Sequence, residues 1–258
     1  MQASHPGCLF SYTMSNSTYF WIDIITIAGP LALSFDKRVA FFKEWKYFLS
    51  AMFITSGIYL IWDAIFTAIG VWRFNPEFVL GIYLGNLPWE EIFFFVAIPY
   101  ACLFIYACLR HYFPGMENRN MGRFLSLLLL IFSITMVVMH YNKLYTAITF
   151  SLLAFTLLNQ LLVTRGTYAT HLYAAWFVTI IPMLIVNGLL TGLPILIYEN
   201  TENIAIRVPA LLPGMTYGIP VEDFFYNLLY MMWMVWIYEA RKNRKAIHLF
   251  TPEPEELT

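Results

Sequence analysis

Seven long apolar runs constrain the fold of this chain more than any other feature. They fall at about 19–35, 47–71, 88–110, 121–140, 144–164, 171–197 and 220–240. About 20 mostly apolar residues cross the ~30 Å hydrocarbon core of a bilayer as a helix. Hydrophobic residues make up 60% of the chain and charged residues only 12%, so a soluble fold would leave large apolar patches in water. We therefore expect an all-α integral membrane protein with seven transmembrane helices, the first of which is the weakest because it is short and carries Asp23 and Pro30.

Basic residues gather in alternate connections between these runs. One set comprises Lys37, Arg38, Lys43 and Lys46 after the first run, Arg110, Arg119 and Arg123 around the third connection, Arg165 in the fifth, and Arg241, Lys242, Arg244 and Lys245 after the seventh. The other connections hold only Arg73, Lys143 and Arg207. Because basic residues concentrate on the cytoplasmic side, we expect a multi-pass protein of the cell membrane with its N-terminus outside and its C-terminus in the cytoplasm.

A weak internal repeat organises the chain. LPWEEIFFF at 87–95 resembles IPVEDFFYN at 219–227, and WDAIFTAIG at 62–70 aligns with VNGLLTGLP at 186–194. Runs one to three and five to seven then point the same way, since a single run separates them, as in a parallel repeat. The predicted order is an exposed N-terminal tail (1–18), a three-helix repeat (19–112), a linker helix (113–143), a second repeat (144–241) and a cytoplasmic tail (242–258), a 3+1+3 architecture.

Each repeat carries an acidic pair at the start of its third helix. The four candidate catalytic carboxyls are Glu90, Glu91, Glu222 and Asp223. A proline followed by an acid is also a common helix start, in which the carboxylate interacts with the positive end of the helix dipole. Such a helix start needs only one carboxylate, however, and both repeats have two. At the edge of hydrocarbon, desolvation favours the neutral carboxyl, the form a general acid needs. Neighbours on a helix point about 100° apart, so we expect one acid of each pair to face the bundle and the other to meet water or an arginine, Arg73 or Arg207.

Asp63 is the most deeply placed carboxyl in the predicted helices other than the first, and it is a fifth catalytic candidate, since ionisable groups within membrane spans are usually functional. A structural role is equally open, because the repeat aligns Asp63 with Asn187, which could hydrogen-bond it across the repeat axis. Asp23 is expected to be structural.

Aromatic residues follow both acidic pairs. The candidate substrate-binding residues are Phe94, Phe95, Phe225, Tyr226 and Asn187. Ring faces turned inward could stabilise a cation, although packing against lipid would explain most of these rings equally well. Trp72, Trp89 and Tyr217 are expected at the membrane interface.

Several chemistries leave no trace in the sequence. The chain has no glycine-rich nucleotide motif, no phosphate-binding loop and no Asp-rich prenyl-diphosphate motif, and its five histidines and three cysteines are scattered. We therefore expect no metal, no cofactor and no nucleic-acid partner. A retinal Schiff base is also excluded, because the seventh run holds no lysine before Lys242.

The two acidic motifs resemble those of heterodimeric-type lycopene cyclases in their fused, single-chain form. They read Pro88-Trp89-Glu90-Glu91 and Pro220-Val221-Glu222-Asp223. Further matches are FNPEFVLGIYLGNLPWEEIFFF at 74–95, NGLLTGLPILIYEN at 187–200 and GIPVEDFFYNLLY at 218–230, so the resemblance spans nearly the whole chain. Trp89 departs from the smaller residues usual at its position.

The resemblance implies a carotenoid cyclase that converts the linear ψ-end groups of lycopene into β-ionone-type rings without net redox. An apolar carotenoid in the bilayer would be the substrate, with one acid from each motif as general acid and base and Asp63 third. The alternatives are a carotenoid end-group hydratase, a C50 carotenoid cyclase and a small proton- or cation-coupled transporter. A purely structural, partner-binding membrane protein would leave the doubled acids without a role.

Overall fold

Seven α-helices make up most of the computed structural model, which describes residues 16–209 and 217–250, with side chains described up to residue 243. They are α1 (Thr18–Leu33), α2 (Trp45–Ala68), α3 (Trp89–Tyr112), α4 (Arg119–Met139), α5 (Leu144–Leu162), α6 (Ala169–Gly192) and α7 (Val221–Phe250). Each helix begins within three residues of the start of its predicted run, because the length of each apolar run fixes where a spanning helix can begin. The side chains of Arg244 and Lys245 and most of the two predicted tails lie outside the described residues.

Five of these helices, α2 to α6, are long and apolar enough to cross a membrane, α2 together with the short 3-10 helix η1 (Phe41–Glu44) before it. α1 is apolar but shorter, and its 16 residues reach about 24 Å at 1.5 Å per residue. α7 is not among the five, although its 30 residues are more than long enough. The chain is thus a mostly helical, multi-pass protein, and the prediction of seven spans is met by five such helices and one shorter apolar helix.

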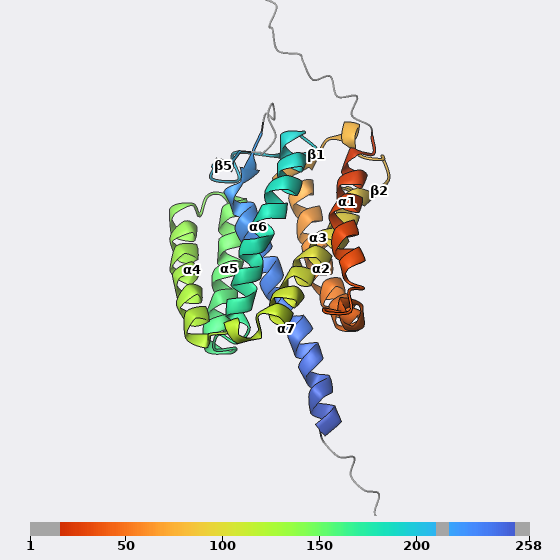
Figure 1. Ribbon diagram of the computed structural model, residues 1–258. Helices are drawn as coiled ribbons and strands as arrows, with labels where there is room; N and C mark the ends of the chain where they lie inside the picture. The colour runs from red at the N-terminus through yellow and green to blue at the C-terminus, as the bar shows by residue number, and fades with distance from the viewer. Residues whose placement is uncertain (1–15, 210–216, 251–258) are drawn as a thin grey trace, which may run out of the picture.

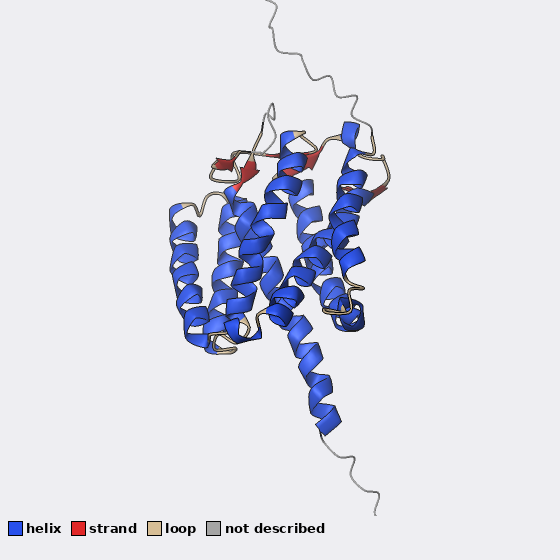
Figure 2. Ribbon diagram, in the orientation of Figure 1, coloured by secondary structure: helices blue, strands red, loops and turns tan. Residues whose placement is uncertain are grey.

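Short strands, which the all-α prediction missed, lie at one end of the helices (Figure 2). The antiparallel pairs are β1 (Trp72–Phe74) with β4 (Leu196–Tyr198), β2 (Tyr83–Leu84) with β3 (Leu87–Pro88), and β5 (Arg207–Val208) with β6 (Ile219–Pro220). Strands of two or three residues are too short to produce a periodic signal. The predicted helical run at 171–197 is therefore wrong at its end, where α6 stops at Gly192 and β4 follows.

The helices of the two halves pack in matching pairs. α1 packs on α3 and α5 on α7, while α2 packs on α7 and α6 on α3, so that α3 and α7 meet at the centre and α4 lies outside against α5 and α6 (Figure 1). α2 and α6 each have 24 residues, and equivalent positions lie 124 residues apart, as Trp45 and Ala169 show. Equivalent positions of α3 and α7 lie 132 apart, as Trp89 and Val221 show.

A ribbon formed by β1 and β4 joins the two halves symmetrically. Trp72 pairs with Tyr198 and Phe74 with Leu196, while Arg73 lies opposite Ile197. Two equivalent strands paired in this way make a self-complementary contact, like the contact at a two-fold axis. The ribbon lies at the end of the bundle where α3 and α7 begin (Figure 1).

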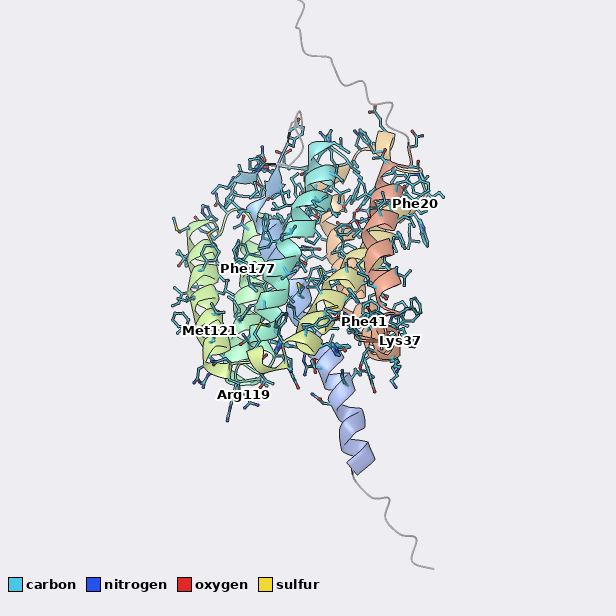
Figure 3. The ribbon with its side chains drawn as sticks, viewed as in Figure 1. Phe20, Lys37, Phe41, Arg119, Met121 and Phe177 are labelled. Atoms are coloured by element: carbon cyan, nitrogen blue, oxygen red, sulfur yellow. The ribbon has the colours of Figure 1, made fainter. Side chains whose placement is uncertain are left out.

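Basic residues mark the opposite end of the bundle. Lys37 and Arg119 both lie there, at the end away from the strands (Figure 3). Arg110 pairs with the buried Glu239 of α7 at this end, and Lys242 pairs with Glu44. The acidic motifs and the largest clusters of basic residues are thus separated by the length of the helices.

Close contact between α4 and α6 depends on one glycine. A Cβ atom added at Gly122 would lie 2.7 Å from the Cβ of Ala169, well inside van der Waals contact. Beside it, the hydroxyls of Ser126 and Tyr173 hydrogen-bond at 2.6 Å. Gly57 on α2, by contrast, has open space where a Cβ would stand.

Candidate active site

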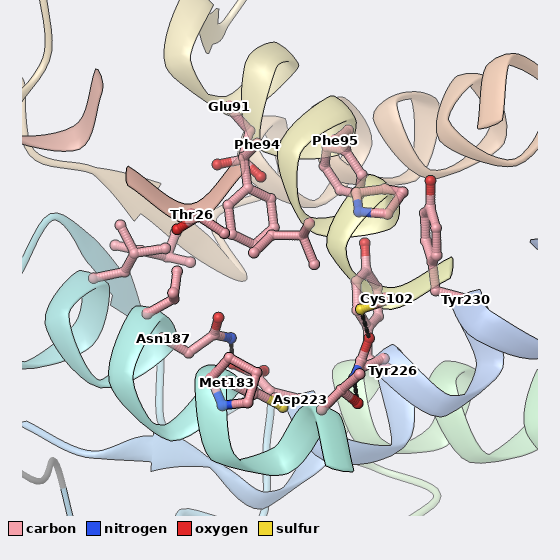
Figure 4. Close-up of a pocket in the computed structure, with 18 of the residues that line it drawn as sticks. Thr26, Glu91, Phe94, Phe95, Cys102, Met183, Asn187, Asp223, Tyr226 and Tyr230 are labelled. Atoms are coloured by element: carbon pink, nitrogen blue, oxygen red, sulfur yellow. Dashed lines mark hydrogen bonds between the residues drawn. The ribbon is translucent and has the colours of Figure 1, made fainter. Parts of the chain in front are cut away.

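An apolar cavity lies between α1, α3, α6 and α7 and encloses about 970 Å³ of empty space, its open side included. Residues of α3 stand on one side, including Glu91, Phe94 and Phe95, and residues of α6 and α7 stand on the other (Figure 4).

Most of the residues singled out in the sequence line this cavity. They are Asp63, Glu91, Phe94, Phe95, Asn187, Asp223 and Tyr226. The structure places Glu90, Glu222 and Phe225 elsewhere: Phe225 packs among Phe132, Phe150 and Trp176, on the α4 and α5 side of α7. The second acid of each motif therefore faces the cavity, and the first does not.

The first acids of the two motifs hold the adjoining loops. Glu90 accepts a hydrogen bond from the backbone N–H of Leu80 at 2.6 Å. Glu222 accepts one from the backbone N–H of Ile204 at 2.9 Å and another from the hydroxyl of Thr146 at 2.6 Å. Both carboxyls are fully buried. The expectation that the outer acid meets water or an arginine is thus wrong, because the loops fold back over the helix starts and supply donors.

The two arginines expected near these acids contact other groups. Arg207 donates to the side-chain oxygen of Asn200 and lies over the ring of Tyr198, 5.4 Å from its centroid. Arg73 is exposed in the middle of β1.

Glu91 and Asp223 each accept a hydrogen bond from a tyrosine at the start of another helix. Tyr19 of α1 donates to Oε2 of Glu91 at 2.5 Å, and Tyr145 of α5 donates to Oδ1 of Asp223 at 2.7 Å. Each tyrosine is the second residue of its helix, so the arrangement repeats in the two halves. Sequence reasoning missed both tyrosines, although aligning α1 with α5 would have paired them.

The two carboxyls differ in how many donors they meet. Asp223 accepts two further hydrogen bonds on Oδ2, from Tyr198 at 2.9 Å and from Asn187 at 3.3 Å. Three donors favour an ionised carboxylate, whereas burial with a single donor favours the neutral acid. Burial raises the pKa of Tyr198 well above its usual range, and the charge of Asp223 adds to that shift. Tyr198 therefore keeps its proton and remains a donor.

Asp63 lines the same cavity but contacts a different partner from the one expected. Its Oδ1 accepts a hydrogen bond from the indole N–H of Trp72 at 2.6 Å, whereas Asn187 donates to Asp223. The expected bond between Asp63 and Asn187 is therefore wrong. Trp72 is buried, with 5% of its surface exposed, which corrects its expected place at the membrane interface. Within the described residues, Oδ2 of Asp63 has no hydrogen-bond partner.

Asp23, expected to be structural, is buried in α1 outside the cavity. Neither of its carboxyl oxygens has a hydrogen-bond partner in the described part of the chain.

Comparison with known proteins gives one match. The sequence model of a family described as lycopene cyclase matches residues 16–109 and 142–240, well over half of the chain. The two matched segments contain α1, α2, α5 and α6 with most of α3 and α7, and the stretch between them contains all of α4. No curated protein and no solved structure matches.

Proposed function

Because the chain belongs to the lycopene cyclase family, we propose that it closes the linear ψ-end groups of lycopene into β-ionone-type rings within the membrane. One observation carries this proposal: Glu91 and Asp223, from equivalent positions of the two halves, face one apolar cavity but have different numbers of hydrogen-bond donors. Two carboxyls whose surroundings favour opposite protonation states can act as acid and base in the same site.

Glu91 acts as the general acid in this proposal. It gives its proton to C2 of the end group, which leaves a cation at C1. The C5=C6 double bond attacks C1, closing the C1–C6 bond and moving the cation to C5. Loss of the proton on C6 then forms the ring double bond. One proton is gained at C2 and one is lost from C6, so no oxidant or reductant is consumed.

Asp223 acts as the base that removes the proton from C6. Hydrogen bonds from Tyr145, Tyr198 and Asn187 favour its ionised form and fix its position. The rings of Phe94, Phe95 and Tyr226 in the cavity wall can stabilise the cation through their electron-rich faces.

The proton must return from Asp223 to Glu91 before the next reaction. Asp63 lines the same cavity and has an oxygen without a hydrogen-bond partner in the described residues. We assign this return step to Asp63.

The proposed architecture is two parallel three-helix repeats, 19–112 and 144–241, joined by a linker at 113–143, with all seven helices in the membrane. The matching helix pairs and the symmetric ribbon of β1 and β4 support it. The basic end of the bundle, with Lys37 and Arg119, would face the cytoplasm. The catalytic carboxyls then lie toward the outer leaflet.

Hydration is the competing outcome of the same protonation step, since water could capture the cation at C1. The lining of the cavity is largely apolar, which favours ring closure. The polar groups at its reacting end bind one another: Tyr19 donates to Glu91, while Tyr145, Tyr198 and Asn187 donate to Asp223. Cyclisation of a C50 carotenoid would use the same carboxyls on a longer substrate.

The test is pigment analysis of lycopene-accumulating bacteria that express the chain. Wild type should give cyclised carotenoid, and Glu91→Gln and Asp223→Asn should each lower the yield by about 10²-fold or more, as expected for loss of a general acid or base. Glu90→Gln and Glu222→Gln are matched controls that keep an accepting oxygen and should retain most activity. Persistent lycopene with well-expressed wild type, or hydroxylated end groups instead of rings, would refute the assignment.

A further inference from the structure

The two halves of the bundle form equivalent grooves with different contents. One groove lies between α3 and α6, and its counterpart lies between α7 and α2, since α3 corresponds to α7 and α6 to α2. The cavity described above occupies the first groove.

Aromatic side chains fill the groove between α2 and α7. The ring of Tyr59 lies 4.6 Å from that of Tyr230, 5.6 Å from that of Trp233 and 5.4 Å from that of Trp62, measured between centroids. Tyr226 completes the cluster, 4.7 Å from Tyr59. All five rings are buried or half-buried, so they occupy this groove.

Smaller residues stand at the equivalent positions of the groove between α3 and α6. In place of Tyr59 and Trp62 of α2, α6 has Met183 and Val186. In place of Tyr230 and Trp233 of α7, α3 has Ile98 and Ala101. All four smaller residues line the cavity. The same backbone arrangement is thus closed on one side by five rings. It is open on the other side, where four of these positions carry smaller residues and Phe94 stands in place of Tyr226.

The open groove extends well beyond the carboxyls. Along α3 its lining runs from Glu91 to Ile105, about 21 Å at 1.5 Å per residue. Only the end near Glu91 and Asp223 carries catalytic carboxyls, so an extended apolar ligand would have its end group there and its chain along α3 and α6.

We propose that this groove binds the polyene chain of the carotenoid, that Ile98, Ala101, Met183 and Val186 set its width, and that the filled groove restricts the enzyme to one end group at a time. This inference rests on the proposed function, because that function supplies the ligand. A substrate that is cyclised at both ends must then leave the groove and bind again with its other end inward.

The test measures bound pigment rather than product. Glu91→Gln protein is purified in detergent from lycopene-accumulating cells, and the lycopene retained per protein is measured by its absorbance. Adding Val186→Trp, which gives α6 the same residue as Trp62 at the equivalent position of α2, should lower the retained lycopene at least about tenfold, because the larger side chain leaves no space for the polyene chain. Ala101→Leu on the opposite wall should act in the same direction and does not depend on the folding of the tryptophan variant.

Ile185→Trp is the matched control, since Ile185 is the neighbour of Val186 but half of its surface is exposed (50%). It should leave bound lycopene unchanged. Equal retention with Val186→Trp, an equal loss with Ile185→Trp, or a Glu91→Gln protein without lycopene while wild type forms rings, would overturn the inference. If the expected pattern appears but wild type forms no rings, the groove stands and the cyclase proposal fails.

Discussion

Replacing Tyr198 with phenylalanine tests whether Asp223 is the base. The change removes one hydroxyl, which donates to Oδ2 of Asp223 at 2.9 Å from a buried position. A hydrogen bond to a charged group contributes about 1.5–3 kcal/mol. Asn187 still donates to the same oxygen, although its bond is long at 3.3 Å, so we expect a loss near the lower end of this range. Since each ~1.4 kcal/mol is a factor of ten in rate, Tyr198→Phe should slow ring formation about tenfold.

The assay is the initial rate of ring formation from lycopene by purified protein in detergent, with bound lycopene measured separately. The rate should fall while lycopene binding stays within about twofold, because the hydroxyl contacts the carboxylate and the ring remains. Tyr173→Phe is the control, since its hydroxyl bonds Ser126 far from the carboxyls. An unchanged rate, an equal loss in the control, or a loss explained by weaker lycopene binding would refute the role given to Asp223.

Three further predictions concern packing, a buried carboxyl and the reaction course. Gly122→Ala should lower the free energy of unfolding in detergent by about 1–3 kcal/mol, because the new Cβ would clash with the Cβ of Ala169. Gly57→Ala, at a position with open space, should be neutral or stabilising by up to about 1 kcal/mol. Equal effects of the two substitutions would contradict this packing. Trp72→Phe should cost about 1–3 kcal/mol by removing the hydrogen bond to Asp63, and adding Asp63→Leu should recover part of it. A time course of the wild-type reaction should show one-ring carotenoid free in the membrane before two-ring product, and two-ring product without that intermediate would argue against a single groove.

The helices could be predicted from the sequence, because each corresponds to a long apolar run, and a run of about 20 apolar residues favours a membrane-spanning helix. The acidic motifs could also be placed at the starts of α3 and α7, since a proline followed by acids is typical of a helix start. Aligning the two halves also predicts that equivalent helices run in the same direction.

Which acid faces the cavity could not be predicted, because it depends on the rotation of α3 and α7 about their axes. Glu90 and Glu91 differ by about 100° in direction, and a chain apolar on nearly all sides gives little sign of which direction is inward. The donors to Glu91 and Asp223 come from Tyr19 and Tyr145, more than 70 residues away in the chain.

The loops were the other gap. Strands of two or three residues carry no periodic pattern, yet they bring Trp72 and Tyr198 over the cavity. The burial of Trp72 and its bond to Asp63 follow from that ribbon, and a tryptophan near the end of an apolar run is more often found at the membrane surface.

The ribbon of β1 and β4 bears on the choice between two products. Trp72 and Tyr198, paired across it, both line the cavity beside the carboxyls. In the proposed reaction, the cation at C1 is captured either by the C5=C6 double bond of the same end group or by a water molecule that enters the cavity. The ratio of ring to alcohol product then depends on the rate at which the end group folds onto C1 relative to the rate at which water passes under the ribbon. Substitutions that weaken the pairing of β1 with β4 should therefore shift that ratio toward alcohol even when the carboxyls and their hydrogen-bond donors are unchanged.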